Sequence, residues 1–318
     1  MDGDARGRGG LPDGILSAEA TGPVPGWGWT ETALSVMVLV WGVNFAVVKS
    51  ALGAFQPLAF NALRFIIASV FVFVVLRRQG RLRLPEPRHR VRVLALGLLG
   101  NLLYQIFFIL GLSRTGAGHA SVMLALTPVM TAFLSMLSGD ERPGPRTWGG
   151  AATAIVGVAL VSGASLRAAG PDALVGDAIL VAASAAWALY TVGARPIVRH
   201  YGSVPTTAWT LWAGALGLSV VGAPSLAAQD WGAVPRAAWG GLVFSALFAI
   251  GLAYLIWYRG VERIGNTRTA IFSNLTPVVA LAAGAMLLGE HPSALSIAGA
   301  LLTIGGVWIV RSDPGSAG

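Results

Sequence analysis

Residues 111–161 read GLSRTGAGHASVMLALTPVMTAFLSMLSGDERPGPRTWGGAATAIVGVALV, and residues 260–310 read GVERIGNTRTAIFSNLTPVVALAAGAMLLGEHPSALSIAGALLTIGGVWIV. The two stretches align without a gap at an offset of 149 (260 − 111). Both contain Leu-Thr-Pro-Val, at 126–129 and at 275–278. Other matched pairs include Gly111 with Gly260, Glu141 with Glu290, Gly150 with Gly299, and Gly157 with Gly306. Matches this numerous, in order and at one offset, indicate an internal duplication.

The composition is that of a membrane protein. Hydrophobic residues make up 55% of the 318 residues, charged residues make up 11%, and the mean hydropathy is +0.69. A soluble domain carries about a quarter charged residues, so this chain could not cover a water-facing surface. A helix needs roughly 20 apolar residues to cross the hydrocarbon core. Stretches of that length lie near residues 31–52, 57–76, 91–112, 117–138, 146–164, 174–195, 204–224, 237–259, 266–288 and 293–311.

The spans and the duplication together predict an all-α integral membrane protein with ten transmembrane helices, arranged as two inverted five-helix repeats. The first repeat covers residues 31–164 and the second covers residues 174–311. Residues 1–29 are rich in Gly, Pro, Arg and Asp and are expected to form a disordered cytoplasmic tail. Because each repeat has an odd number of helices, the second must enter the membrane upside down.

The positive charges agree with this inversion. Lys and Arg favour cytoplasmic loops. The loop after the seventh predicted helix carries Arg236, whereas the equivalent loop after the second carries Arg77, Arg78, Arg81, Arg83, Arg88, Arg90 and Arg92. Equivalent loops therefore have opposite charge bias, and both termini are expected in the cytoplasm. The net charge of +8 is mainly a topology signal, and no nucleic-acid partner is expected.

The sequence resembles the EamA family of the drug/metabolite transporter superfamily. The resemblance is carried by the segment WGVNFAVVKSALGAFQPLAFNALRF at residues 41–65, by the two LTPV segments that each lead to a turn containing Glu, and by the glycine-rich helix after each turn. It implies ten helices, inverted repeats, a central substrate cavity, and secondary transport or export of amino acids and related metabolites. The two halves differ at one position of interest, because Arg64 is replaced by Trp212 at the matching distance after Pro57 and Pro205.

Arg64 is the one charged residue predicted inside a span. A charge at membrane depth costs about 2.5–3.5 kcal/mol on insertion scales. Its expected partners are backbone carbonyls, the outer interface reached by snorkelling, or an anionic group of the substrate. A carboxylate or phosphate would match the fork of the guanidinium. A purely structural role is the alternative.

Transporters built from inverted repeats bind substrate near the midplane of the membrane, so polar and aromatic residues deep in each span are candidates. Trp41 and Asn44, for example, are three residues apart and share a helix face. The alternatives are hydrogen bonds between packed helices and, for the aromatic residues, contact with lipid. The expected substrate-binding residues are Trp41, Asn44, Arg64, Asn101, Tyr104, Gln105, Ser184, Trp187, Tyr190, Trp212, Tyr254 and Asn274.

Two Thr-Pro pairs lie in the middle of equivalent spans. They are Thr127-Pro128 and Thr276-Pro277. Proline removes a backbone donor and clashes with the preceding turn, so each pair should kink its helix and free a carbonyl. Such a kink could be a hinge of the transport cycle or a static bend that serves packing.

Several charged residues lie at helix ends. Lys49 and its repeat partner Arg195 could gate the two mouths or simply snorkel to the interface. Glu141 and Glu290 are expected to cap the helix that follows each of them, and movement of protons is the alternative. The carboxylates all map to tails, loops or helix ends. Either ion coupling uses an acid such as Glu31 or Asp177, or transport is facilitated or driven by exchange.

Other classes of function have little support in the sequence. The chain has no cysteine, its four histidines are scattered, and no catalytic motif occurs, so we expect no cofactor, no metal site and no enzymatic activity. We expect a secondary transporter of the cytoplasmic (inner) membrane that exports amino acids, related amphiphilic carboxylates or drugs by alternating access. A membrane scaffold or sensor without transport activity is the alternative. The substrate, the coupling ion and the oligomeric state stay open.

Overall fold

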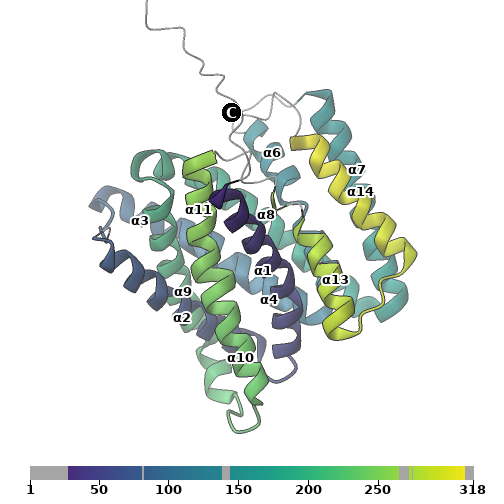
Figure 1. Ribbon diagram of the computed structural model, residues 1–318, viewed down its shortest axis with the longest axis horizontal. Helices are drawn as coiled ribbons and strands as arrows, with labels where there is room; N and C mark the ends of the chain where they lie inside the picture. Colours follow the sequence, from purple (N-terminus) through teal and green to yellow (C-terminus); the bar gives the residue numbers. More distant parts are fainter. Residues whose placement is uncertain (1–27, 81, 138–143, 265–271, 274, 312–318) are drawn as a thin grey trace, which may run out of the picture.

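The computed structural model describes residues 28–80, 82–137, 144–264, 272–273 and 275–311. Every regular element among them is a helix, and the helices run side by side in a bundle (Figure 1). The helices are α1 (Trp29–Ala51), α2 (Pro57–Arg78), α3 (Pro87–Gly97), η1 (Leu98–Leu103), α4 (Tyr104–Arg114), α5 (Ala117–Leu124), α6 (Thr127–Leu137), α7 (Pro145–Ala169), α8 (Pro171–Tyr201), α9 (Ser203–Ala228), α10 (Arg236–Phe244), η2 (Ser245–Leu252), α11 (Ala253–Ile264), α13 (Thr276–Leu288) and α14 (Ala294–Arg311).

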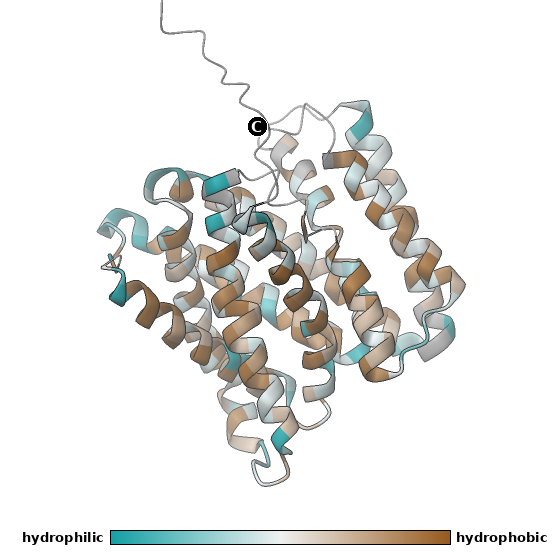
Figure 2. Cartoon of the chain, in the orientation of Figure 1, coloured by the Kyte–Doolittle hydropathy of each residue, from teal (hydrophilic) through white to brown (hydrophobic). Residues whose placement is uncertain are grey.

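Many of these helices have the length and composition of membrane spans. Within the described residues, seven helical runs are long and apolar enough to cross a membrane, and the shorter stretches Thr276–Leu288 and Ala294–Val310 are also apolar. Apolar residues follow the lengths of the helices, including their outward faces, and many polar residues lie at their ends (Figure 2). Such surfaces belong in lipid, and the chain is therefore a multi-pass membrane protein.

The helix ends follow from local sequence. Pro57, Pro87 and Pro171 each stand in the first turn of a helix, where the missing N–H would have no partner anyway. At the other end of α13, Gly289 has a φ of 65°, which is the left-handed conformation that closes many helices and that only glycine adopts without strain. These prolines and Gly289 therefore determine where helices begin and end, and so where the chain turns from one helix to the next.

The predicted span 117–138 is interrupted at its Thr-Pro pair. α5 ends at Leu124, and α6 begins at Thr127. Because Pro128 cannot donate a hydrogen bond, carbonyls in the last turn of α5 need other donors. Thr127 Oγ1 donates to the carbonyl of Leu124 at 2.8 Å, and Ser184 Oγ of α8 donates to the carbonyl of Met123 at 3.0 Å. The break is therefore stabilised by its own threonine and by a neighbouring helix.

The third span of each predicted repeat contains a π-helical segment. η1 separates α3 from α4, and η2 separates α10 from α11. The two segments begin 147 residues apart (245 − 98), close to the offset of the duplication. The extra residue in each turn of a π-helix shifts the face that the rest of the helix presents, and such segments are frequent at functional sites.

α7 and α14 pack on each other through glycines at equivalent positions. A Cβ added at Gly306 would lie 2.5 Å from the carbonyl oxygen of Gly150, and one added at Gly299 would lie 2.6 Å from that of Gly157. The two helices are therefore antiparallel and nearly in backbone contact, side by side in Figure 1. In a bilayer, where apolar burial does not drive helices together, small residues allow this approach.

Candidate functional site

Arg64 is the centre of a buried polar cluster. Its side chain is 2% exposed. Nη2 donates to Asn61 Oδ1 and to Gln105 Oε1, both at 2.6 Å, and Nη1 donates to Ser245 Oγ at 3.2 Å. The expected partners were backbone carbonyls, the interface or a substrate, and the structure instead gives three neutral side-chain oxygens. Nε has no partner among the described residues, and no carboxylate contacts the guanidinium there.

This cluster joins elements far apart in the sequence. Arg64 and Asn61 come from α2, Gln105 comes from the first turn of α4, and Ser245 is the first residue of η2. Asn61 also donates from Nδ2 to the carbonyl of Gln105 at 3.0 Å. Sequence reasoning missed Asn61 and Ser245. Asn61 precedes Arg64 by three residues, a spacing that places both on one helix face and could have identified it. Nothing in the sequence around Ser245 indicates its contact with Arg64.

Aromatic rings line the neighbourhood of the guanidinium. Arg64 Cζ lies 5.4 Å from the ring centroid of Phe108, and Tyr104 and Tyr254 are near enough to interact with its charge. Phe108 stacks on Tyr104, and the ring of Trp187 lies 4.9 Å from that of Tyr104. The chain of rings continues to Tyr190 at 5.1 Å from Trp187. Arg64 is thus connected, directly or through neighbouring rings, with four aromatic candidates from the two predicted repeats: Tyr104, Trp187, Tyr190 and Tyr254.

Trp41 and Asn44 lie on α1. Trp41 Nε1 donates to the carbonyl of Ala249 in η2 at 2.8 Å, and its ring lies 5.5 Å from that of Trp257. The Oδ1 atom of Asn44 is buried and has no hydrogen-bond partner among the described residues. A buried amide oxygen without a donor is costly, and this makes it available to a ligand or to water.

The remaining candidates have packing partners. Trp212 Nε1 donates to the carbonyl of Ser69 at 3.2 Å, so this residue joins α9 to α2. Ser184 is fully buried and bonds to α5. Asn101 lies in η1 against Gly214 of α9, although its Oδ1 atom is unpartnered. Asn274 lies outside the described residues.

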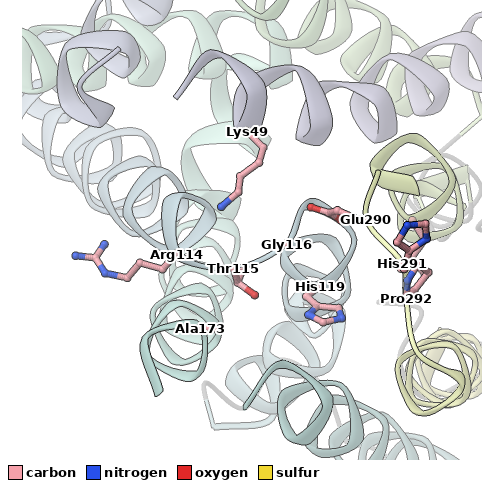
Figure 3. Close-up of a pocket in the computed structure, with 10 residues that line it drawn as sticks. Lys49, Arg114, Thr115, Gly116, His119, Ala173, Glu290, His291 and Pro292 are labelled. Atoms are coloured by element: carbon pink, nitrogen blue, oxygen red, sulfur yellow. The ribbon is translucent and has the colours of Figure 1, made fainter. Parts of the chain in front are cut away.

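A second polar site lies at the corner between α4 and α5. A pocket of about 310 Å³ opens there, which we call the corner pocket; it is lined by Lys49, Arg114, Thr115, Gly116, His119, Ala173, Leu281, Glu290, His291 and Pro292. Lys49 Nζ donates to the carbonyls of Leu112 and Ser113 at 2.9 and 3.0 Å. Figure 3 shows Lys49, from α1, and Glu290, from the connection between α13 and α14, both near this corner. A cation at the C-terminus of α4 is favourable because it meets the negative end of the helix dipole.

Glu290 caps a different helix from the one expected. Ala117 N donates to its Oε1 at 2.7 Å, and Gly118 N donates to its Oε2 at 3.3 Å. The carboxylate therefore caps α5, in the other predicted repeat, and Ser293 Oγ caps α14 by accepting from Ser296 N. The expectation that Glu290 caps the helix after it was wrong. The packing of the bundle brings Glu290 to the start of α5, and no pattern along the chain indicates that contact. Glu141 lies outside the described residues.

Loss of this cap should loosen the corner. We expect Glu290→Ala to speed alkylation of a Thr115→Cys reporter roughly fivefold, the effect of losing a cap worth about 1 kcal/mol. Thr115 is 3% exposed, and the absence of native cysteine makes the reporter unique. The rate is measured with a thiol reagent in detergent. Glu86→Ala at a distant helix end is the control, and equal rates in all three backgrounds would contradict the role of Glu290.

Asp177 is more deeply buried than the sequence indicates. It lies in the second turn of α8 and is 1% exposed, and neither of its oxygens has a hydrogen-bond partner among the described residues. It is one helical turn beyond Ala173, which lines the corner pocket, and it interacts electrostatically with His119. The expectation that all carboxylates occupy tails, loops or helix ends is corrected for Asp177. α8 starts at Pro171, before the predicted span at 174, and α4 and α5 pack against α8.

The sequence profile of the EamA-like transporter family matches residues 28–163 and again residues 174–312. The chain belongs to the EamA-like transporter family. This EamA-like transporter is 29% identical over 269 residues to the uncharacterized transporter YyaM of Bacillus subtilis, with 84% of this chain and 88% of that protein covered. It therefore has the small-molecule substrate and membrane location of a transporter.

Two further relatives of this EamA-like transporter carry names that describe cargo. It is 30% identical to a probable amino-acid metabolite efflux pump of Salmonella typhimurium, with 86% of this chain and 92% of that protein covered. It is 26% identical to a probable terminal-alkyne amino-acid exporter of Streptantibioticus cattleyicolor, with 88% and 92% covered. The crystal structure of another protein matches the fold with a TM-score of 0.63 at 22% identity, covering 88% of this chain and 96% of the other.

Proposed function

We propose that this protein is a secondary transporter that exports amino acids or related amphiphilic carboxylates, with Arg64 as the anchor for the substrate carboxylate. The observation that carries the proposal is a fully buried guanidinium whose three hydrogen-bond partners are neutral oxygens. An uncompensated charge inside a membrane protein is costly and marks a functional site. A carboxylate would neutralise it and match its fork.

The surroundings of Arg64 suit an amphiphilic substrate. Tyr104, Trp187 and Tyr190 form a chain of aromatic rings that begins beside Arg64. Elsewhere among the candidate residues, the unpartnered Oδ1 atoms of Asn44 and Asn101 offer acceptors. An ammonium group of an amino acid needs such acceptors. Because Arg64 is 2% exposed, a substrate reaches it only after helices move, which alternating access provides. The names of the two amino-acid exporters favour this class of substrate.

We propose that residues 31–164 and 174–311 form two inverted halves that together make ten spans. Alternating access moves one half relative to the other. The reciprocal glycine contacts of α7 with α14 support this relation, since each contact maps onto the other under the offset of 149 residues (299 − 150). The Thr-Pro pairs at 127–128 and 276–277 are the proposed hinges. At the break between α5 and α6, the carbonyls of Met123 and Leu124 accept from side-chain hydroxyls, donors that do not depend on a continuous helix.

Inversion makes a prediction about labelling from outside the cell. We expect Ala233→Cys, in the loop after α9, to react with a membrane-impermeant maleimide in intact cells. Gln79→Cys, in the equivalent loop after α2, should react only after permeabilisation. Both positions are exposed in the structure. Labelling of both from the same side would rule out inverted repeats, and the reverse pattern would rule out cytoplasmic termini.

Export is tested by profiling the metabolites that cells release. Cells of a bacterial host expressing the wild type are compared with cells carrying an empty vector, and compounds that accumulate only with the wild type are then tested by counterflow in proteoliposomes. Counterflow of a labelled carboxylate supports a carrier. Release of the same compounds by both cultures, together with no counterflow over a broad panel, favours a membrane scaffold or sensor instead.

A further inference from the structure

Three metal-ligating side chains meet at one end of the bundle, away from Arg64 and the corner pocket. They are Glu86, just before α3, His89 in the first turn of α3, and His200 in the last turn of α8. One ligand atom from each lies within 4.8 Å of the other two. The four histidines look scattered in the sequence, and the expectation of no metal site rested on that. The fold brings the rings of His89 and His200 to a centroid distance of 5.3 Å.

The spacing fits a tetrahedral ion. Two ligands that each lie about 2.0–2.1 Å from a tetrahedral Zn²⁺ are about 3.3–3.4 Å from each other. His200 Nε2 lies 3.3 Å from Glu86 Oε1. An ion held between these two atoms would replace the proton that they now share, and His89 would provide the third ligand with a small movement. Two imidazoles and a carboxylate form a donor set that Zn²⁺ commonly takes, with water in the fourth position.

Tyr201 holds two of the ligands in place. Its hydroxyl lies 2.7 Å from His89 Nδ1 and accepts a hydrogen bond from Glu86 N at 3.2 Å. A partner on Nδ1 leaves Nε2 of the same ring free to bind a metal, and such partners orient most metal-binding histidines. The Tyr201 ring also packs edge-on against Trp209, at 5.0 Å between centroids. The hydroxyl is therefore positioned by the core of the bundle.

We propose that Glu86, His89 and His200 form a site for a divalent transition-metal ion, most favourably Zn²⁺, that joins the start of α3 to the end of α8. The site is reachable from water, because the side chains of Glu86 and His200 are about half exposed. Arg88 competes with the ion, since its Nε lies 2.8 Å from Glu86 Oε2. Each end of the bridge is a helix terminus, so bound metal should stabilise this end of the fold.

The proposal is tested by isothermal titration of the full-length protein, with its affinity tag removed, using Zn²⁺ as the probe. The wild type should bind one ion and melt at a higher temperature with Zn²⁺ present. We expect His200→Asn and His89→Asn to weaken binding by more than about tenfold, and Tyr201→Phe by about tenfold through loss of the orienting hydroxyl. Arg88→Gln should tighten binding, because it removes the competing cation.

His291→Asn is the matched control, since His291 is an exposed histidine that lines the corner pocket instead. Size-exclusion profiles show whether each variant is folded, and Glu86→Gln serves if a histidine variant is not. The proposal is overturned if the wild type does not bind Zn²⁺ in a 1:1 ratio, or if His291→Asn weakens binding as much as His200→Asn does. Neither readout depends on transport, so failure of the site and failure of the proposed function are separate results.

Discussion

Arg64→Met is expected to reduce transport severely while leaving a folded protein. The substitution removes the guanidinium and keeps much of its length. Truncating one partner of a buried charge pair costs about 2–5 kcal/mol, and each 1.4 kcal/mol, approximately, is a factor of ten in rate, so transport of a carboxylate should fall by about 30-fold or more. Three oxygens, on Asn61, Gln105 and Ser245, lose their donor. The protein should nevertheless fold, because the acceptors of Arg64 in the described residues are neutral and its removal leaves no unpaired buried charge there.

The measurement is counterflow of labelled substrate at matched membrane abundance. Arg236→Met, an exposed arginine after α9, is the control and should transport normally. Arg64→Lys keeps the charge but not the fork, and it should give partial activity with a raised KM. Wild-type counterflow by Arg64→Met would show that the guanidinium is structural and that the substrate carboxylate binds elsewhere.

Gly306→Leu is expected to cause the largest loss of stability. A Cβ at this position would lie 2.5 Å from both Ala154 N and Gly150 O. These neighbours are backbone atoms, which cannot rotate away, so α7 and α14 must separate along their whole contact. Overpacking of this kind typically costs 1–3 kcal/mol, and sometimes more, as an order-of-magnitude figure. The melting temperature in detergent and the abundance in the membrane should both fall.

The adjacent residue provides the control. Gly305 is on the same helix, and a Cβ there meets nothing within 4 Å. Gly305→Leu should therefore melt like the wild type. Equal losses for the two variants would mean that the composition of α14, rather than its contact with α7, determines stability.

The composition and the duplication were enough to predict an all-helical membrane protein. Apolar runs of about 20 residues have few alternatives to a spanning helix, because backbone polar groups must be satisfied within the segment. The interruption at Thr127-Pro128 was also readable, since it depends on a proline that lacks a donor. The need of Arg64 for polar partners followed from the cost of a charge in an apolar segment. These inferences rest on properties of single residues or of one continuous stretch.

Other features depend on which helices are neighbours, and no local pattern contains that information. The acceptors of Arg64 come from three helices, and the cap of α5 comes from Glu290, 173 residues away from Ala117. The burial of Asp177 and the approach of His89 to His200 depend likewise on packing between α8 and its neighbours.

The sequence by itself determined the class of fold, its internal repeat and the residues whose chemistry is costly in a membrane. Only the tertiary structure decided how those residues are paired. The physical reason is that burial in lipid is set by the composition of each segment, whereas hydrogen bonds and close glycine contacts between helices need particular atoms within about 3 Å of each other.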